Sequence, residues 1–166
     1  MTSIVFNLGL LTSPPATANP KYASIIVEES SGRVLYSRSA DKQLFPASLT
    51  KIMTLYLLFE ALQNRRITLG TRMKVSKVAA SRSPSKLYLK PGQTITVENA
   101  ILALVTKSAN DVATVVSEHL GGNERNFAKK MTRKAKAIGM KRTIFKNASG
   151  LPNQAQLSTA RDMARL

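Results

Sequence analysis

Residues 45–51 read Phe-Pro-Ala-Ser-Leu-Thr-Lys, and the apolar run Ile-Met-Thr-Leu-Tyr-Leu-Leu-Phe-Glu-Ala-Leu follows directly at 52–62. A run that is apolar on nearly every side is typical of a helix buried in the middle of a domain. We therefore expect a buried helix from about Ser48 to Gln63, and proline is tolerated at or just before such a start, where Pro46 stands. Ser48 and Lys51 are three residues apart, so on a helix their side chains lie on one face, one turn apart.

This serine and lysine form an S-x-x-K pair, a pattern found in serine acyl-transfer enzymes. Serine is a weak nucleophile until a base takes its proton, and a desolvated lysine can be that base. The alternative from the residues alone is structural, with Ser48 as an N-cap and Lys51 extending its amine to solvent. A second copy, Ser83 to Lys86, contains a proline within a polar stretch, so we expect a loop in which these two side chains need not share a face.

A second element lies at residues 97–113, where two apolar helical stretches flank the polar break Ser108-Ala109-Asn110. One interpretation is a turn between helices in which Ser108 or Asn110 caps the second helix. The other is an S-x-N element, whose serine passes a proton and whose asparagine hydrogen-bonds the substrate or the catalytic lysine. An S-x-x-K helix followed by S-x-N is far more specific than either pattern alone.

With both elements in place, the chain resembles the D-alanyl-D-alanine carboxypeptidases, the low-molecular-mass penicillin-binding proteins, which are serine peptidases. The resemblance runs from about Tyr22 to the last residue. Five further segments resemble the family, at 23–28, 89–92, 110–113, 139–151 and 158–164. Ser149 is a departure, because the family usually has histidine at that place.

The resemblance implies an α+β protein of the penicillin-binding-protein and β-lactamase-like fold, with an antiparallel sheet flanked by helices and a helical lobe. The family's third element, K-T-G on a later strand, is not found in the sequence. We therefore expect residues 19–166 to be the N-terminal part of a transpeptidase-like catalytic domain, truncated before the later sheet strands. Activity of the chain as given is expected to be lost or impaired.

The resemblance also implies roles for four residues. Ser48 would attack the penultimate D-alanine carbonyl of a peptidoglycan stem peptide ending in D-Ala-D-Ala, with neutral Lys51 as its base. Ser108 would relay the proton to the leaving amine and Asn110 would hold the substrate. β-Lactams would acylate Ser48 by the same route.

Two other functions remain open. A β-lactamase would normally have S-D-N where this chain has Ala109, and the sequence offers no convincing deacylating glutamate. A remnant that binds cell-wall peptides without turnover is the other alternative.

The formal net charge of +16 suggests a nucleic-acid-binding protein as a further class. Within 123–139, however, Phe127, Met131, Ala135 and Ile138 recur at helical spacing, so the basic residues form the solvated face of a helix that Gly139 ends. We therefore expect no nucleic-acid partner. Peripheral association with a membrane surface or anionic envelope polymers is the third interpretation of the charge.

The remaining composition excludes several site types. The chain has 166 residues, enough for one domain or part of one, and it has no cysteine. His119 is the single histidine and is expected in the last turn of a helix, so we predict neither a metal site nor a cofactor.

Residues 1–18 contain an apolar run ending in Ala-Thr-Ala, which fits a degenerate signal peptide without the usual positive start. A cytoplasmic tail is the alternative there. The family resemblance favours an exported, periplasmic or otherwise extracytoplasmic protein.

Local patterns predict the smaller elements. Residues 21–27 and 33–38 are expected to form a hairpin with its turn at 29–32. Residues 67–70 and 73–75 are expected to be short extended pieces. Thr96 is a predicted N-cap for a helix over 98–105.

Overall fold

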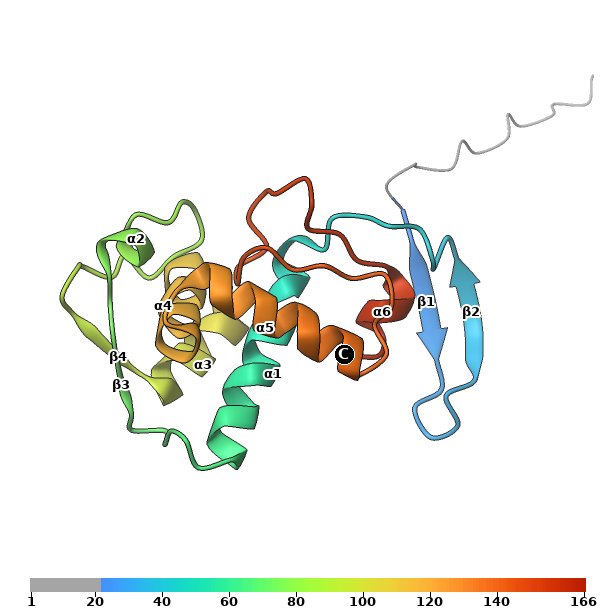
Figure 1. Ribbon diagram of the computed structural model, residues 1–166. Helices are drawn as coiled ribbons and strands as arrows, with labels where there is room; N and C mark the ends of the chain where they lie inside the picture. The colour runs from blue at the N-terminus through green and yellow to red at the C-terminus, as the bar shows by residue number, and fades with distance from the viewer. Residues whose placement is uncertain (1–21) are drawn as a thin grey trace, which may run out of the picture.

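A computed structural model of the protein describes residues 22–166. The boundary predicted at residue 18, and the signal peptide predicted before it, lie outside this range. The chain forms a helical lobe with a small antiparallel sheet at each end (Figure 1). This arrangement agrees with the expected α+β fold.

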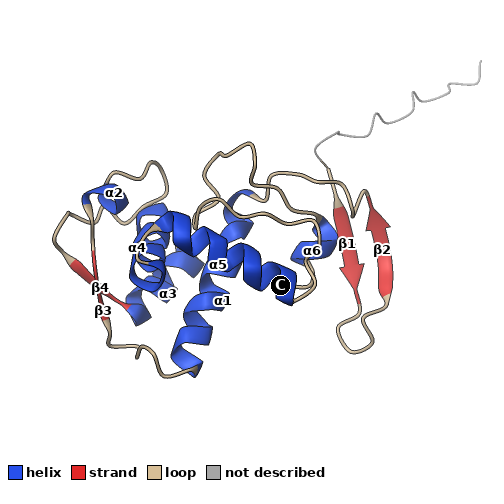
Figure 2. Ribbon diagram, viewed as in Figure 1, coloured by secondary structure: helices blue, strands red, loops and turns tan. Residues whose placement is uncertain are grey.

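The first sheet is the predicted hairpin. Strand β1 (Ser24–Val27) pairs antiparallel with β2 (Val34–Arg38). Every residue of β2 is exposed, which includes Val34, Leu35 and Tyr36. Figure 2 shows the hairpin beside the short helix α6 (Ala160–Met163), at the end of the molecule away from the second sheet.

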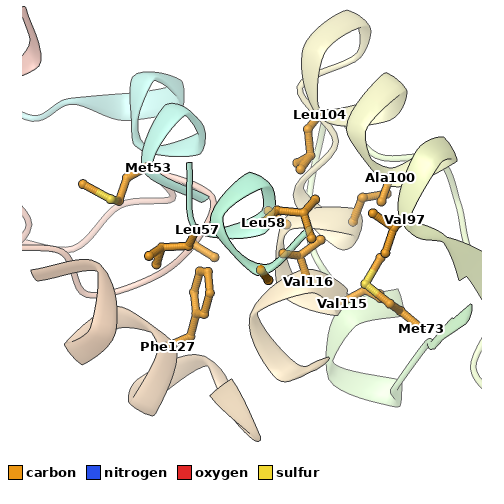
Figure 3. Close-up of a cluster of buried hydrophobic side chains, with 14 of the residues drawn as sticks. Met53, Leu57, Leu58, Met73, Val97, Ala100, Leu104, Val115, Val116 and Phe127 are labelled. Atoms are coloured by element: carbon orange, nitrogen blue, oxygen red, sulfur yellow. The ribbon is translucent and has the colours of Figure 1, made fainter. Parts of the chain in front are cut away.

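The helical lobe is built around α1 (Thr50–Gln63), which follows the 3-10 turn η1 (Ala47–Leu49). Helix α1 packs against α3 (Val97–Thr106), α4 (Asn110–Gly121) and α5 (Glu124–Ala137). Apolar side chains from these helices meet in one core (Figure 3), with Met53, Leu58, Val116 and Phe127 almost fully buried. The prediction of a buried helix after Ser48 is thus confirmed, with the regular α-helix beginning two residues later.

The second sheet pairs β3 (Arg72–Lys74) with β4 (Thr94–Thr96), and the short helix α2 (Lys77–Ala80) follows β3. Thr96 caps α3 as predicted, because its Oγ1 accepts from the Asn99 N–H at 3.2 Å. The prediction of an extended piece at 67–70 is wrong. Those residues form bends and a turn in which the Thr71 N–H donates to the Thr68 carbonyl.

Helix α5 has the predicted amphipathic form. Phe127, Met131 and Ala135 are buried, while the basic residues on the other face are exposed or half-buried. The helix ends before Gly139, whose φ of +86° lies in the left-handed region that glycine favours. Within residues 22–166, no helix has the length and apolar content needed to cross a membrane.

The end of the chain returns to the region just before η1. Leu44 and Ser158 exchange backbone hydrogen bonds of 2.8 and 2.9 Å, and the Asp41 carboxylate pairs with the Arg161 guanidinium. Residues 156–162 therefore fix the approach of the chain to the Ser48 turn.

Candidate active site

Ser48 lies in the 3-10 turn that leads into α1, and it is exposed. Its neighbour Ala47 has a φ of +47°, an unusual conformation for a residue with a side chain. Neither η1 nor α1 has a side-chain cap, so the alternative in which Ser48 is an N-cap is wrong. The hydroxyl makes no hydrogen bond within residues 22–166, which leaves it available to a ligand.

Lys51 lies in the first turn of α1 and is buried, with 4% of its surface exposed. Its Nζ donates to the Ser149 carbonyl at 2.7 Å. Burial lowers the pKa of Lys51 to about 8, because a charged amine is poorly solvated there. The alternative in which this side chain extends to solvent is therefore wrong.

Ser48 and Lys51 are not hydrogen-bonded to each other in the described structure. Such bonds are often long before a substrate arrives and shorten in the complex. Two conditions for a lysine base are nonetheless present, namely a buried amine and a lowered pKa.

The acceptor of Lys51 comes from residues 147–150, which we call the acceptor segment. This segment contacts α1 twice, since the Thr54 hydroxyl also donates to the Ala148 carbonyl at 2.7 Å. Gly150 has a φ of +88°, and a Cβ atom there would lie 1.8 Å from the Ala47 carbonyl oxygen. Only glycine allows this close approach beside Ser48.

The acceptor segment lies within residues 139–151, which resemble the family, but its contact with Lys51 is not evident from the sequence. Nearly 100 residues separate Lys51 from Ser149, and the group that accepts is a backbone carbonyl. The only local signal was Gly150, a glycine in a turn-forming sequence.

Ser108 lies between α3 and α4 with a φ of +53° and is half-buried. Helix α4 has Ala109 at its N-cap with no side-chain cap bond, so the interpretation in which Ser108 or Asn110 caps this helix is wrong. The Ser108 hydroxyl has no hydrogen-bond partner in the described part of the chain. The backbone turns sharply at Ser108, and the Ser108 hydroxyl takes no part in a hydrogen bond that holds this turn.

Asn110 is 7% exposed, and its amide group holds a neighbouring loop. The Nδ2 donates to the Ser83 and Pro84 carbonyls at 3.0 and 2.6 Å. The next residue, Asp111, accepts from the backbone N–H groups of Leu87 and Leu89. The Asn110 Oδ1 makes no hydrogen bond within 22–166 and can accept from a ligand.

These contacts confirm that the second S-x-x-K copy lies in a loop. Ser83 serves as a backbone acceptor there, and the Lys86 Nζ donates to the Ala80 carbonyl at 3.4 Å. Helix α1 packs on both α3 and α4, so the two predicted elements belong to one helical unit. No side-chain hydrogen bond joins Ser108 or Asn110 to Ser48 or Lys51 among the described residues.

A hollow of about 340 Å³ lies beside the serine turn, and its lining includes Phe45, Ala47, Gly150, Leu151 and Pro152. Its lining is mostly apolar, as in many small-molecule sites. Within residues 22–166, no group of three or more His, Cys, Asp or Glu side chains could hold a metal ion.

Comparison with known proteins decides the family. The family model described as D-alanyl-D-alanine carboxypeptidase matches residues 12–166. The chain belongs to this family. The carboxypeptidase DacF of Bacillus subtilis is 34% identical over 99% of this chain and 45% of its own length.

Solved structures agree with this assignment. The carboxypeptidase DacD of Francisella tularensis superposes with a TM-score of 0.85 at 32% identity, covering 96% of this chain and 39% of that one. A penicillin-binding protein of Listeria monocytogenes, in its ampicillin-bound form, gives 0.77 at 32% identity, covering 86% and 58%. The family and the penicillin-binding-protein fold expected from the sequence are thus confirmed, and the chain spans less than half the length of the curated relative DacF.

Proposed function

We propose that this carboxypeptidase-family chain carries the serine acyl-transfer groups that act on peptidoglycan stem peptides ending in D-Ala-D-Ala. The observation that carries the proposal is the buried amine of Lys51, which lies one helical turn from the exposed Ser48. Burial lowers the pKa of this amine to about 8. About a tenth of an amine with a pKa of about 8 is neutral at pH 7, and that neutral fraction can accept a proton.

In the proposed reaction, Lys51 takes the proton of the Ser48 hydroxyl as its oxygen attacks the penultimate D-alanine carbonyl. The first N–H groups of a helical turn have no partner within it, so the Ser48 N–H can donate to the oxyanion. Ser108 passes the proton to the departing D-alanine amine, and the Asn110 Oδ1 accepts from a substrate N–H. Water then hydrolyses the ester on Ser48.

The same chemistry explains a β-lactam as a covalent inhibitor. Attack of the Ser48 oxygen on the lactam carbonyl opens the ring, and the product stays on Ser48 as an ester. The ampicillin-bound relative supports this ligand class. The substrate is part of the cell wall, and we therefore place the reaction outside the cytoplasmic membrane.

The experiment is intact-mass measurement after mixing the folded chain with a labelled penicillin. We expect an adduct of one penicillin on the wild-type chain and on Ser83→Ala, which alters only the loop copy of S-x-x-K, and none on Ser48→Ala. Peptide mapping should place the adduct on Ser48. An adduct that persists in Ser48→Ala would overturn the proposal.

Two other results would favour the alternatives. A folded chain that binds a D-Ala-D-Ala peptide without any adduct points to recognition without turnover. Salt-sensitive binding of random DNA duplexes without an adduct points to the basic surface.

A further inference from the structure

A hydrogen-bond chain runs from the buried Gln156 through Asn147 to the amine of Lys51. The Gln156 Oε1 accepts from the backbone N–H groups of Lys146 and Asn147 at 2.8 and 3.0 Å. The Gln156 side chain is 2% exposed and donates back to the Asn147 Oδ1 at 3.4 Å. The buried Gln156 therefore holds both the backbone N–H and the side-chain oxygen of Asn147.

Asn147 in turn holds the acceptor segment. Its Oδ1 accepts from the Gly150 N–H at 2.7 Å and from the Ser149 N–H at 3.2 Å. Its Nδ2 donates to the Leu151 carbonyl at 2.9 Å. One side chain thus sets the path of the backbone on both sides of Ser149.

The decisive geometry lies in one peptide unit. The carbonyl that accepts from Lys51 and the Gly150 N–H that donates to Asn147 belong to the same Ser149–Gly150 peptide. A peptide unit is planar, so fixing the direction of its N–H also fixes the direction of its carbonyl. Asn147 consequently determines where the acceptor of the Lys51 amine points.

We propose that Asn147 is a positioning residue for Lys51, acting through the Ser149–Gly150 peptide. A neutral amine has two N–H donors and one lone pair. With one N–H held by the Ser149 carbonyl, the rotation of the amine is restricted and its lone pair is oriented for the serine hydroxyl. This inference rests on the proposed function of Lys51 as a base.

The charges around this amine are few. No carboxylate forms an ion pair with Lys51 within residues 22–166. One carboxylate is bound to the acceptor segment, that of Glu124, which accepts from the Ala148 N–H at 3.1 Å and is paired with Arg82. A new negative charge at position 147 would act on Lys51 through the adjacent peptide.

The test uses two substitutions of Asn147 in the full chain. Asn147→Ala removes the acceptor for the Gly150 N–H, and we expect the plateau rate of penicillin acylation to fall about tenfold or more. Asn147→Asp keeps an oxygen acceptor and adds a charge. We expect it to keep a plateau near wild type while its pH–rate midpoint moves up by about one pH unit, because a nearby carboxylate favours the ammonium form.

Asn123 provides a matched control, because its Oδ1 also accepts a backbone N–H, that of Asn126 at 2.8 Å, but at the start of α5. Asn123→Ala and Asn123→Asp should leave both the plateau and the pH midpoint unchanged. A purely structural role for Asn147 would lower the folded fraction of both of its variants without moving the midpoint, and that result would overturn the proposal.

A readout independent of catalysis is the pKa of Lys51, followed by NMR of lysine labelled at Cε and assigned with Lys51→Met. An unchanged Lys51 pKa in Asn147→Asp overturns the positioning role. If wild type forms no penicillin adduct, the proposed function fails, and this pKa measurement decides the positioning role by itself.

Discussion

The Lys51 turn and the Ser108–Asn110 corner hold their polar side chains in different ways. Lys51 is buried and is held by a backbone carbonyl from the far end of the chain. Asn110 binds the carbonyls of a loop some 27 residues before it, while Ser108 has no side-chain partner among the described residues. The first region prepares an amine by burial and distant contacts, whereas the second builds a rigid corner and leaves its hydroxyl free.

The two elements therefore depend on different parts of the protein. Changes in the acceptor segment should disturb the chemistry at Ser48. Changes at the corner should first disturb the loop at 83–89.

Lys51→Arg should have the largest effect of the substitutions considered. A guanidinium cannot give up its proton near neutral pH, so it cannot act as the base. We expect the rate of penicillin acylation to fall about a thousandfold or more, measured by intact mass over time. The matched control is Lys86→Arg in the loop copy of the motif, which should acylate at the wild-type rate. Substantial acylation by Lys51→Arg would exclude Lys51 as the base.

Gly150→Ala tests whether the acceptor segment needs its close approach to the serine turn. The left-handed φ and the contact of a new Cβ with the Ala47 carbonyl should together lower the free energy of unfolding by about 3 kcal/mol or more. Gly92 has a similar φ of +87° but open space around it, so Gly92→Ala should cost only about 1 kcal/mol. Urea denaturation measures both values, and equal losses would contradict the close-approach argument.

Asn110→Ala tests the Ser108–Asn110 corner. Its loss leaves the Ser83 and Pro84 carbonyls without their donor, and we expect unfolding to become easier by about 2 kcal/mol. Hydrogen exchange should accelerate across residues 83–89 and stay unchanged in the acceptor segment. Asn99→Ala, on the exposed face of α3, serves as the control and should change neither. Exchange that accelerates equally at 147–150 would show that the two regions are coupled.

The smallest effect is the pH dependence of the Lys51 region. With a pKa of about 8, the neutral fraction and hence the acylation rate should rise about tenfold between pH 7 and pH 9 and then level off.

The same lowered pKa affects stability. The unfolded chain binds more protons than the folded one between about pH 8 and 10.5, so this group should make the free energy of unfolding rise across that window. Lys51→Met should remove this rise in the free energy of unfolding.

An acylation rate that stays flat between pH 7 and pH 9 would contradict the lowered pKa of Lys51.

Much of the fold follows from local patterns. The hairpin, the buried helix after Ser48, the Thr96 cap and the amphipathic helix α5 each depend on a short stretch of sequence with a clear period or cap. The β-branched Ile67 and Thr68 favour an extended piece at 67–70, but the turn that Thr71 closes on the Thr68 carbonyl, with Gly70 as its third residue, prevails.

The site was predictable as residue types but not as contacts. Ser48 and Lys51 stand in one motif, yet the acceptor of Lys51 is a main-chain atom that any residue at 149 can supply. The contact with Lys51 therefore does not depend on the side chain at position 149. The interpretation of the Ser108 corner as a helix cap is wrong because Ala109, which has no side-chain oxygen, occupies the N-cap position of α4.

The bridge between Asp41 and Arg161 joins residues 120 positions apart, and the neighbouring pairing of Leu44 with Ser158 spans a similar distance. Contacts of such long sequence separation slow folding, because a large loop must close before they form. On a ribosome, the serine turn is made long before residues 147–162 emerge. The lysine should therefore stay hydrated and protonated in the nascent chain, and reactivity toward penicillin should arise only after residues 147–162 have emerged.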